Sequence, residues 1–191
     1  MIRTILPALA LAALAPSTAL ADQAISVPPF KSIELHGGGQ AVLRHGDRQR
    51  VVLIKGDPNI AQIEVKGDGR LVLSPCDSDK NRCWGWHELK VEVTTPSIAA
   101  IAVHGGGDLR AQAGFPKQPS LSLAVHGGGD ADVRALAADN VSVAVHGGGD
   151  AKVRAERTLA ADVHGGGEVR FWGHPAVSSS THGGGEVRSG E

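Results

Sequence analysis

The sequence is poor in large and reactive side chains. Its 191 residues include no tyrosine, three phenylalanines, three tryptophans and only two cysteines. A core with so few large side chains has to be thin and filled by rows of Val, Leu, Ile and Ala. The charges nearly balance, with 19 basic and 20 acidic residues, so composition gives no sign of nucleic acid or an anionic membrane surface as a partner. Past the N-terminal segment, no stretch is long and apolar enough to span a bilayer.

The first 21 residues are typical of a secretory signal peptide. Arg3 precedes an apolar run over residues 5–14, and Ala19-Leu20-Ala21 forms a small-x-small cleavage site before Asp22. No cysteine stands at that site to carry a lipid. We therefore expect an exported protein, periplasmic or secreted, whose mature residues 22–191 form a single domain.

The two cysteines, Cys76 and Cys83, enclose six residues. In an oxidising compartment two cysteines this close are expected to form a disulfide that closes a surface loop. The alternative is a metal pair completed by His87. A gap of six residues is unlike the Cys-x2–4-Cys spacing of structural zinc sites, which favours the disulfide.

A repeated motif dominates the sequence. His-Gly-Gly-Gly followed by Gln, Asp or Glu begins at six positions: His36, His104, His126, His146, His164 and His182. The last five copies are 22, 20, 18 and 18 residues apart, close to one turn of a solenoid. Each copy is flanked by residues that alternate apolar and polar, which is the pattern of a strand. We predict an all-β fold, a parallel β-helix (β-solenoid) with one motif in each turn, over residues 101–188.

The alternation also predicts which side chains face solvent. In the copy at His146, Val143, Val145 and Val153 are apolar, whereas the residues between them are mostly polar. Stacked turns should then align like residues in columns on the outside. The histidine column is His104, His126, His146, His164 and His182. The acidic column is Asp108, Asp130, Asp150, Glu168 and Glu186. The arginine column is Arg110, Arg134, Arg154, Arg170 and Arg188. If the glycines keep the strand parity, all three columns share one face; a sharp glycine corner would place them on different faces.

Residues 22–100 are less regular. Apolar runs at 51–54, 63–65, 71–73 and 89–93 are typical of strands, and Asp57-Pro58-Asn59 and Gly67-Asp68-Gly69 are typical of the turns between them. A solenoid needs covered ends. We expect these strands to cap or extend it.

The chain resembles a known family over residues 28–188. The residues that carry the resemblance are Phe30-x-x-Ile33, the Gly37 triplet, Val51–Ile54 with Gly56-Asp57, and Pro96-x-Ile98-x-x-Ile101 leading into His104-Gly-Gly-Gly-Asp108. They are similar to the autotransporter adhesin head (GIN) domain family, secreted bacterial domains of unknown function. The resemblance implies a right-handed parallel β-helix and brings no catalytic residues. Family members typically have Ser-Gly-Ser-Gly-Asp where this chain has His-Gly-Gly-Gly-Asp.

The histidine column has two interpretations. One is a structural ladder of packed imidazoles. The other is a divalent-metal site for Zn, Cu or Ni, because neutral imidazole is a common ligand of these ions. In one extended strand His146 and Asp150 would lie about 13 Å apart. Only histidines on adjacent turns could therefore share an ion.

The acidic and arginine columns predict either surface salt bridges or a polar strip that binds a glycan or a protein partner. Trp84 and Trp86 could stack on sugar rings or cover the end of the solenoid. The polar residues are spread evenly, and neither Gly-x-Ser-x-Gly nor His-Glu-x-x-His occurs. We therefore expect a non-enzymatic, adhesin-like interaction module that requires no cofactor. The alternatives are a periplasmic metal-binding protein and, less favoured, a polysaccharide-acting β-helix enzyme.

Overall fold

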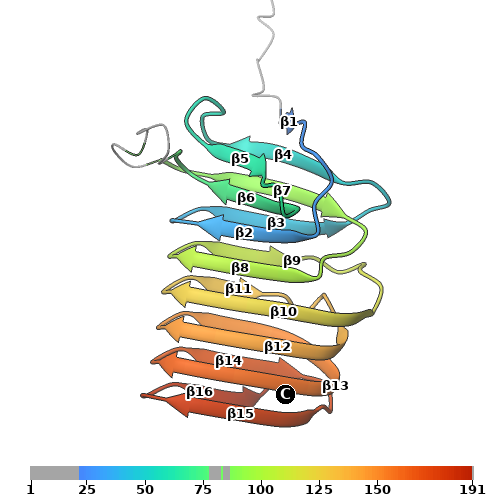
Figure 1. The fold of residues 1–191 in the computed structure, drawn as a ribbon, viewed down its shortest axis with the longest axis vertical. Helices are drawn as coiled ribbons and strands as arrows, with labels where there is room; N and C mark the ends of the chain where they lie inside the picture. The colour runs from blue at the N-terminus through green and yellow to red at the C-terminus, as the bar shows by residue number, and fades with distance from the viewer. Residues whose placement is uncertain (1–21, 78–82, 84–86, 191) are drawn as a thin grey trace, which may run out of the picture.

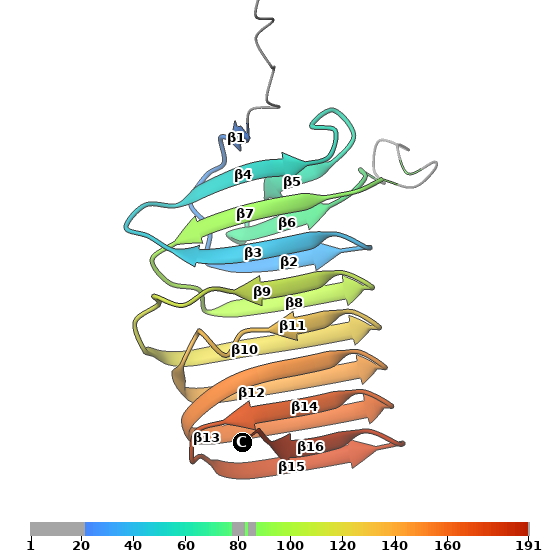
Figure 2. The ribbon, with the colours of Figure 1, turned by 180° about the vertical axis from the view of Figure 1, so that it is seen from behind.

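The computed structural model describes residues 22–77, 83 and 87–190. This part of the chain consists of strands joined by turns and loops, and none of its segments is a helix able to cross a membrane. Two sheets lie face to face and share one apolar core (Figures 1 and 2). The all-β solenoid predicted from the repeat is confirmed. The predicted signal peptide, Trp84 and Trp86 lie outside the described residues.

Each regular turn has a strand in the front sheet, a glycine corner and a strand in the back sheet. Four front strands that precede a corner are β8 (Ala100–Gly105), β10 (Gln118–Gly127), β12 (Ala138–Gly147) and β15 (Ala176–His182). The back strands that follow are β9 (Asp108–Ala111), β11 (Asp130–Asp132), β14 (Glu168–Trp172) and β16 (Glu186–Ser189). The long β13 (Asp150–Gly165) begins in the back sheet and ends in the front sheet. In Figure 1 the front strands run to the left, the back strands run to the right and each turn lies below the last, so the coil is right-handed.

The turns stack in parallel with matching residues level. His126 lies level with both His104 and His146, and Val125 with Val103 and Val145. Because the sheets face each other, alternate residues fill the space between them. The inward rows are aliphatic: Leu121, Leu123, Val125, Val141, Val143 and Val145 are all buried. Among the buried core residues of the described chain, Phe30 is the one aromatic side chain.

The glycine triplets turn the chain from one sheet to the other. Gly127, the first of its triplet, has φ +115, a conformation that glycine adopts without a Cβ penalty. Gly128 N donates to Gly105 O of the preceding turn at 3.0 Å. Gly129 is buried against the backbone of Gly107. The glycines therefore form a sharp corner, and the arrangement with all columns on one face is wrong: the histidines lie on the front sheet and the acids on the back sheet.

The N-terminal region closes the upper end of the solenoid. The first motif copy joins β2 (Ser32–His36) to β3 (Gln40–His45), and these strands pair in parallel with β8 and β9. The residues between β3 and β8 in the sequence form the strands above β2 and β3. These strands are β4 (Arg50–Lys55), β5 (Gln62–Val65), β6 (Arg70–Ser74) and β7 (Lys90–Thr95), with β1 (Gln23–Ile25) at the edge. The β1–β4, β4–β7 and β5–β6 pairs are antiparallel. The four predicted strands are thus confirmed: β6 and β7 extend the sheets in parallel with β2 and β3, and β4 and β5 cap them by antiparallel pairing. The predicted Cys76–Cys83 disulfide is present beside them.

Candidate functional site

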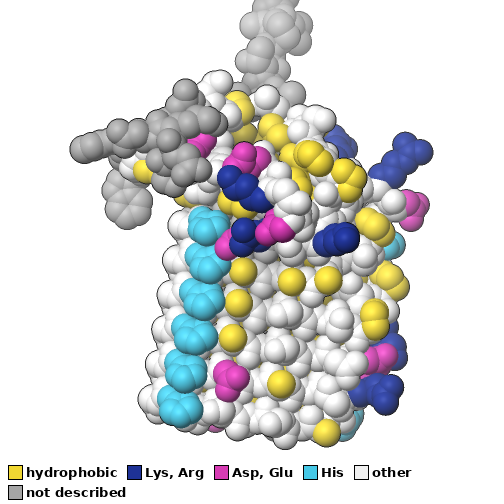
Figure 3. Space-filling model, viewed as in Figure 1, with side chains coloured by type: hydrophobic (Ala, Val, Ile, Leu, Met, Phe, Trp, Pro, Cys, Tyr) yellow, Lys and Arg dark blue, Asp and Glu magenta, His cyan; other side chains and the backbone are white. Residues whose placement is uncertain are grey.

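Six imidazoles stack along one edge of the front sheet, each just before a glycine corner (Figure 3). We call them the histidine ladder: His36, His104, His126, His146, His164 and His182. Neighbouring ring centroids are 4.7–5.1 Å apart. Four pairs are parallel to within 3–4°, whereas His36 and His104 are inclined by 16°. The sequence prediction placed five of these residues in the column and left out His36.

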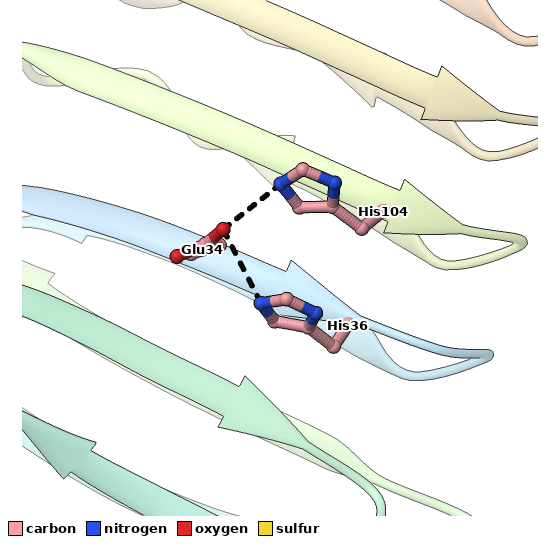
Figure 4. Close-up of side chains that lie close together, drawn as sticks. All are labelled: Glu34, His36 and His104. Atoms are coloured by element: carbon pink, nitrogen blue, oxygen red, sulfur yellow. Dashed lines mark ion pairs between the residues drawn. The ribbon is translucent and has the colours of Figure 1, made fainter.

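A second outward-facing residue lies beside each imidazole, two positions earlier on the same strand. The register aligns this second row as Glu34, Ala102, Ala124, Ala144, Asp162 and Ser180. Alanine methyl groups therefore flank the middle of the ladder. Carboxylate contact with the ladder occurs at its upper end, through Glu34 (Figure 4).

The contacts of Glu34 join three turns of the chain. Its Oε1 lies 2.9 Å from His104 Nε2 and 3.3 Å from His36 Nε2, and its Oε2 lies 2.8 Å from Arg70 Nη1. Its side chain is only 11% exposed. One donor atom from each of Glu34, His36 and His104 falls within a cluster no wider than 4.8 Å. Sequence reasoning missed this cluster, because Glu34 and His104 are 70 residues apart and no repeat period links them.

The acidic column lies on the back sheet in the predicted register. Asp108, Asp130, Asp150, Glu168 and Glu186 are level with one another, and Gln40 continues the row upward. Asp150 N donates to Asp130 Oδ1 at 3.2 Å, which links two successive turns. The column and the ladder are therefore on opposite sides of the glycine corner.

The predicted arginine column is wrong at two of its five positions, Arg134 and Arg154, whereas Arg110, Arg170 and Arg188 lie in one row. Two positions after the acids, the register aligns Arg110, Asp132, Lys152, Arg170 and Arg188. Arg154 is instead level with Trp172, and Arg134 follows the end of β11. The reason is spacing: the copies at His126 and His146 have three residues between acid and arginine, and the other three copies have one.

Opposite charges on the back sheet pair closely. Arg134 Nε and Nη2 donate to the two carboxylate oxygens of Asp132 at 2.8 and 2.6 Å. Burial is the largest single influence and raises the pKa of Asp132, but the hydrogen bonds and positive charge of Arg134, together with the charge of Lys152, outweigh it, so the pKa lies below its usual value. Glu168 accepts from Arg188 of the next turn at 2.7 Å and from Arg170 at 2.8 Å. These two hydrogen bonds, Arg188 first, lower the pKa of Glu168.

Trp172 adds an aromatic ring to this face. The guanidinium of Arg134 lies over it, 4.5 Å from the ring centroid, in cation–π geometry. Shallow depressions follow the same face from Gln40 and Lys90, past Arg110 and Asp130, to Trp172 and Arg188. The sequence signal for Trp172 was weak, since only one copy of the repeat has an aromatic residue there.

The Glu168 pairs predict a pH-dependent contribution to stability. A carboxylate whose pKa is lowered on folding stabilises the fold above its unfolded value, 4.5, and loses that effect as the pH falls through the lowered value. Glu168→Gln should therefore lower the melting temperature slightly at pH 7, because the pairs are solvent-exposed. The difference from wild type should shrink as the pH falls below 4.5 and through the lowered pKa. Thermal unfolding from pH 3 to pH 7 tests this, and a difference that is the same at every pH would contradict it.

The family model described as "Putative auto-transporter adhesin, head GIN domain" matches residues 29–118 and 116–175. The chain belongs to this family. A solved "putative adhesin" from Bacteroides fragilis is 20% identical, with a TM-score of 0.52, over 91% of this chain and 98% of that chain. A "putative cell adhesion protein" from Clostridium sporogenes is 15% identical, with a TM-score of 0.42, over 88% and 99%. The first of these similarities supports the fold alone, and no curated protein matches the chain.

Proposed function

We propose that this GIN domain is a non-enzymatic, exported module that binds a glycan at a cell surface or within the envelope. The observation that carries the proposal is a charged strip on the back sheet. The strip consists of Asp108, Arg110, Asp130, Asp132, Arg134, Asp150, Lys152, Arg154, Glu168, Arg170, Trp172, Glu186 and Arg188. Its groups recur at the spacing of the turns, about 4.8 Å. A chain-like ligand with repeating polar groups would suit such a surface. Family membership supports an adhesin-like role, and the disulfide supports an oxidising compartment.

The chemistry of the strip suits a polyhydroxylated ligand. The carboxylates accept hydrogen bonds from hydroxyl groups, and the guanidiniums and the Lys152 ammonium donate to oxygen acceptors. The indole of Trp172 offers a large, rigid contact surface for an apolar sugar face. Opposite charges alternate in the row of Arg110, Asp132 and Lys152. This alternation suits hydroxyl-rich ligands better than it suits a ligand of one charge.

Binding of the labelled protein to a microarray of bacterial and host polysaccharides tests this function. We expect a subset of polysaccharides to retain the wild-type protein. The triple variant Asp130→Asn, Asp150→Asn, Arg154→Ala should lose most of that signal, because it removes charged groups from three positions on the strip. These side chains project outward, so the variant should keep the fold.

Front-sheet variants provide the matched control. Ser122→Ala and Ser142→Ala change two exposed residues that lie level with each other on the opposite sheet, and they should bind as wild type does. Failure of every polysaccharide to retain the protein would overturn the proposal. The proposal would also be overturned if the front-sheet variants lost as much polysaccharide binding as the back-sheet triple variant. Retention of a protein partner by the strip, with no polysaccharide bound, would overturn the glycan assignment.

A further inference from the structure

We propose that Glu34, His36 and His104 form a binding site for one divalent transition-metal ion of the Zn²⁺ type. This site lies at the upper end of the front sheet, separate from the charged strip, and is independent of glycan binding. It combines an oxygen donor with two imidazole nitrogens, a donor set that suits Zn²⁺ and neighbouring first-row ions. Figure 4 shows the two Nε2 atoms pointing toward the same carboxylate oxygen.

The donor spacing is close to that of a metal site. Zn–N and Zn–O bonds of 2.0–2.2 Å in a tetrahedron place the donor atoms about 3.4 Å apart. The Glu34 oxygen is 2.9 Å from one imidazole nitrogen and 3.3 Å from the other, and the three donor atoms lie within 4.8 Å of one another. Small rotations of the two partly exposed rings would complete the geometry.

The middle of the ladder does not offer the same site. Its rings are parallel and level, so equivalent nitrogens on neighbours are separated by about the ring spacing, 4.9 Å at His126. The residues beside these rings are Ala102, Ala124 and Ala144, which cannot ligate a metal. Asp162 follows in the same row, but among the described residues only Glu34, His36 and His104 bring three donor atoms within 4.8 Å of one another. At the upper end the ring centroids of His36 and His104 are also 4.8 Å apart, but the rings are inclined by 16° and Glu34 supplies the third donor.

The surroundings of Glu34 also fit a ligand role. Arg70 holds Oε2 by an ion pair at 2.8 Å and leaves Oε1 to the imidazoles, as an outer-shell partner orients a ligating carboxylate. Glu34 and His36 line a cleft together with Gln62, Lys66, Arg70 and Ser74. This open side leaves room for a water molecule to complete four-coordination, as in zinc sites with three protein ligands.

Calorimetric titration of the purified protein with ZnCl2 tests the site. We expect one Zn²⁺ bound per chain. Glu34→Gln, His36→Ala and His104→Ala should each weaken binding by at least about 100-fold, since removing a direct ligand should cost no less than the 10- to 100-fold lost with an outer-shell partner. The His36 side chain is 42% exposed, against 11% for Glu34, so its variant should keep the fold even if Glu34→Gln does not.

His146→Ala is the matched control, because it removes a ladder imidazole that has alanine in place of Glu34 beside it. It should leave both the affinity and the stoichiometry unchanged. The proposal is overturned if wild-type protein gives no binding heat, if several ions bind per chain, or if His146→Ala weakens binding as much as His36→Ala. The charged-strip triple variant should still bind Zn²⁺. The Zn²⁺ titration therefore tests this site even if the charged strip fails to bind a glycan.

Discussion

Gly127→Ala is expected to destabilise the protein by about 3 kcal/mol or more, combining the cost of an unfavourable φ with that of overpacking. Gly127 has φ +115, where an L side chain is strained. A Cβ added there would come within 2.6 Å of Gly105 O. That oxygen cannot move freely, because it accepts the hydrogen bond from Gly128 N that joins the two turns. Chemical denaturation followed by circular dichroism measures the loss.

Gly128→Ala is the control for this prediction. It changes the neighbouring residue by the same methyl group, but a Cβ at Gly128 meets nothing within 4 Å. Its stability should therefore stay close to wild type. Equal losses from the two variants would show that chain flexibility, rather than the close approach of successive corners, sets the requirement for glycine.

Leu123→Ala is expected to cost about 2–5 kcal/mol, the range for truncating a buried leucine. Leu123 is 1% exposed and occupies the inward row between Ile101 and Val143. The neighbouring turns are held by continuous parallel pairing, so they cannot collapse easily into the cavity. In a solenoid each turn contacts mainly its neighbours, and the loss should weaken both interfaces of this turn.

Ser122→Ala tests the direction of the side chains in the same strand. Ser122 is exposed while Leu123 is buried, so its truncation should change the free energy of unfolding by less than about 0.5 kcal/mol. A large loss for Ser122→Ala with a small one for Leu123→Ala would mean that the strand is shifted by one residue, since such a shift exchanges its two faces.

The regular part of the fold could be predicted because every turn repeats the same motif and the same alternation of apolar and polar residues. The spacing of the motif copies indicated stacked turns, and alternation identified Val125 and Val145 as inward and His126 and His146 as outward. Strand parity is a local property of the backbone. The parity within each strand is therefore independent of the conformation of the corner. This explains why the ladder and the acidic column are in the predicted register.

The displaced arginines could have been recognised from the sequence, because three residues separate Asp130 from Arg134 and Asp150 from Arg154, and one separates acid from arginine in the other copies. Two features could not be predicted from local pattern. The direction of the corner depends on the positive φ of Gly127, which the sequence permits but does not require. The Glu34 cluster depends on β2 pairing with β8 across the whole cap. Such a long-range contact has no period in the sequence.

The corner also separates the two proposed activities in space. The ladder and the Glu34 site lie on the front sheet, and the charged strip lies on the back sheet. The two sheets share a core of fully buried aliphatic side chains. A substitution on one outer face should therefore leave the other site intact, and each site can be tested alone.

Both proposed sites depend on a register in which each motif copy lies level with the next. Nuclear Overhauser contacts between imidazole ring protons measure that register most directly. With ring centroids 4.7–5.1 Å apart, contacts are expected between each successive pair from His36 to His182, including the His36–His104 pair across the cap. Absence of ring contacts between His126 and His146, or between His36 and His104, would contradict the stacked solenoid and both sites built on it.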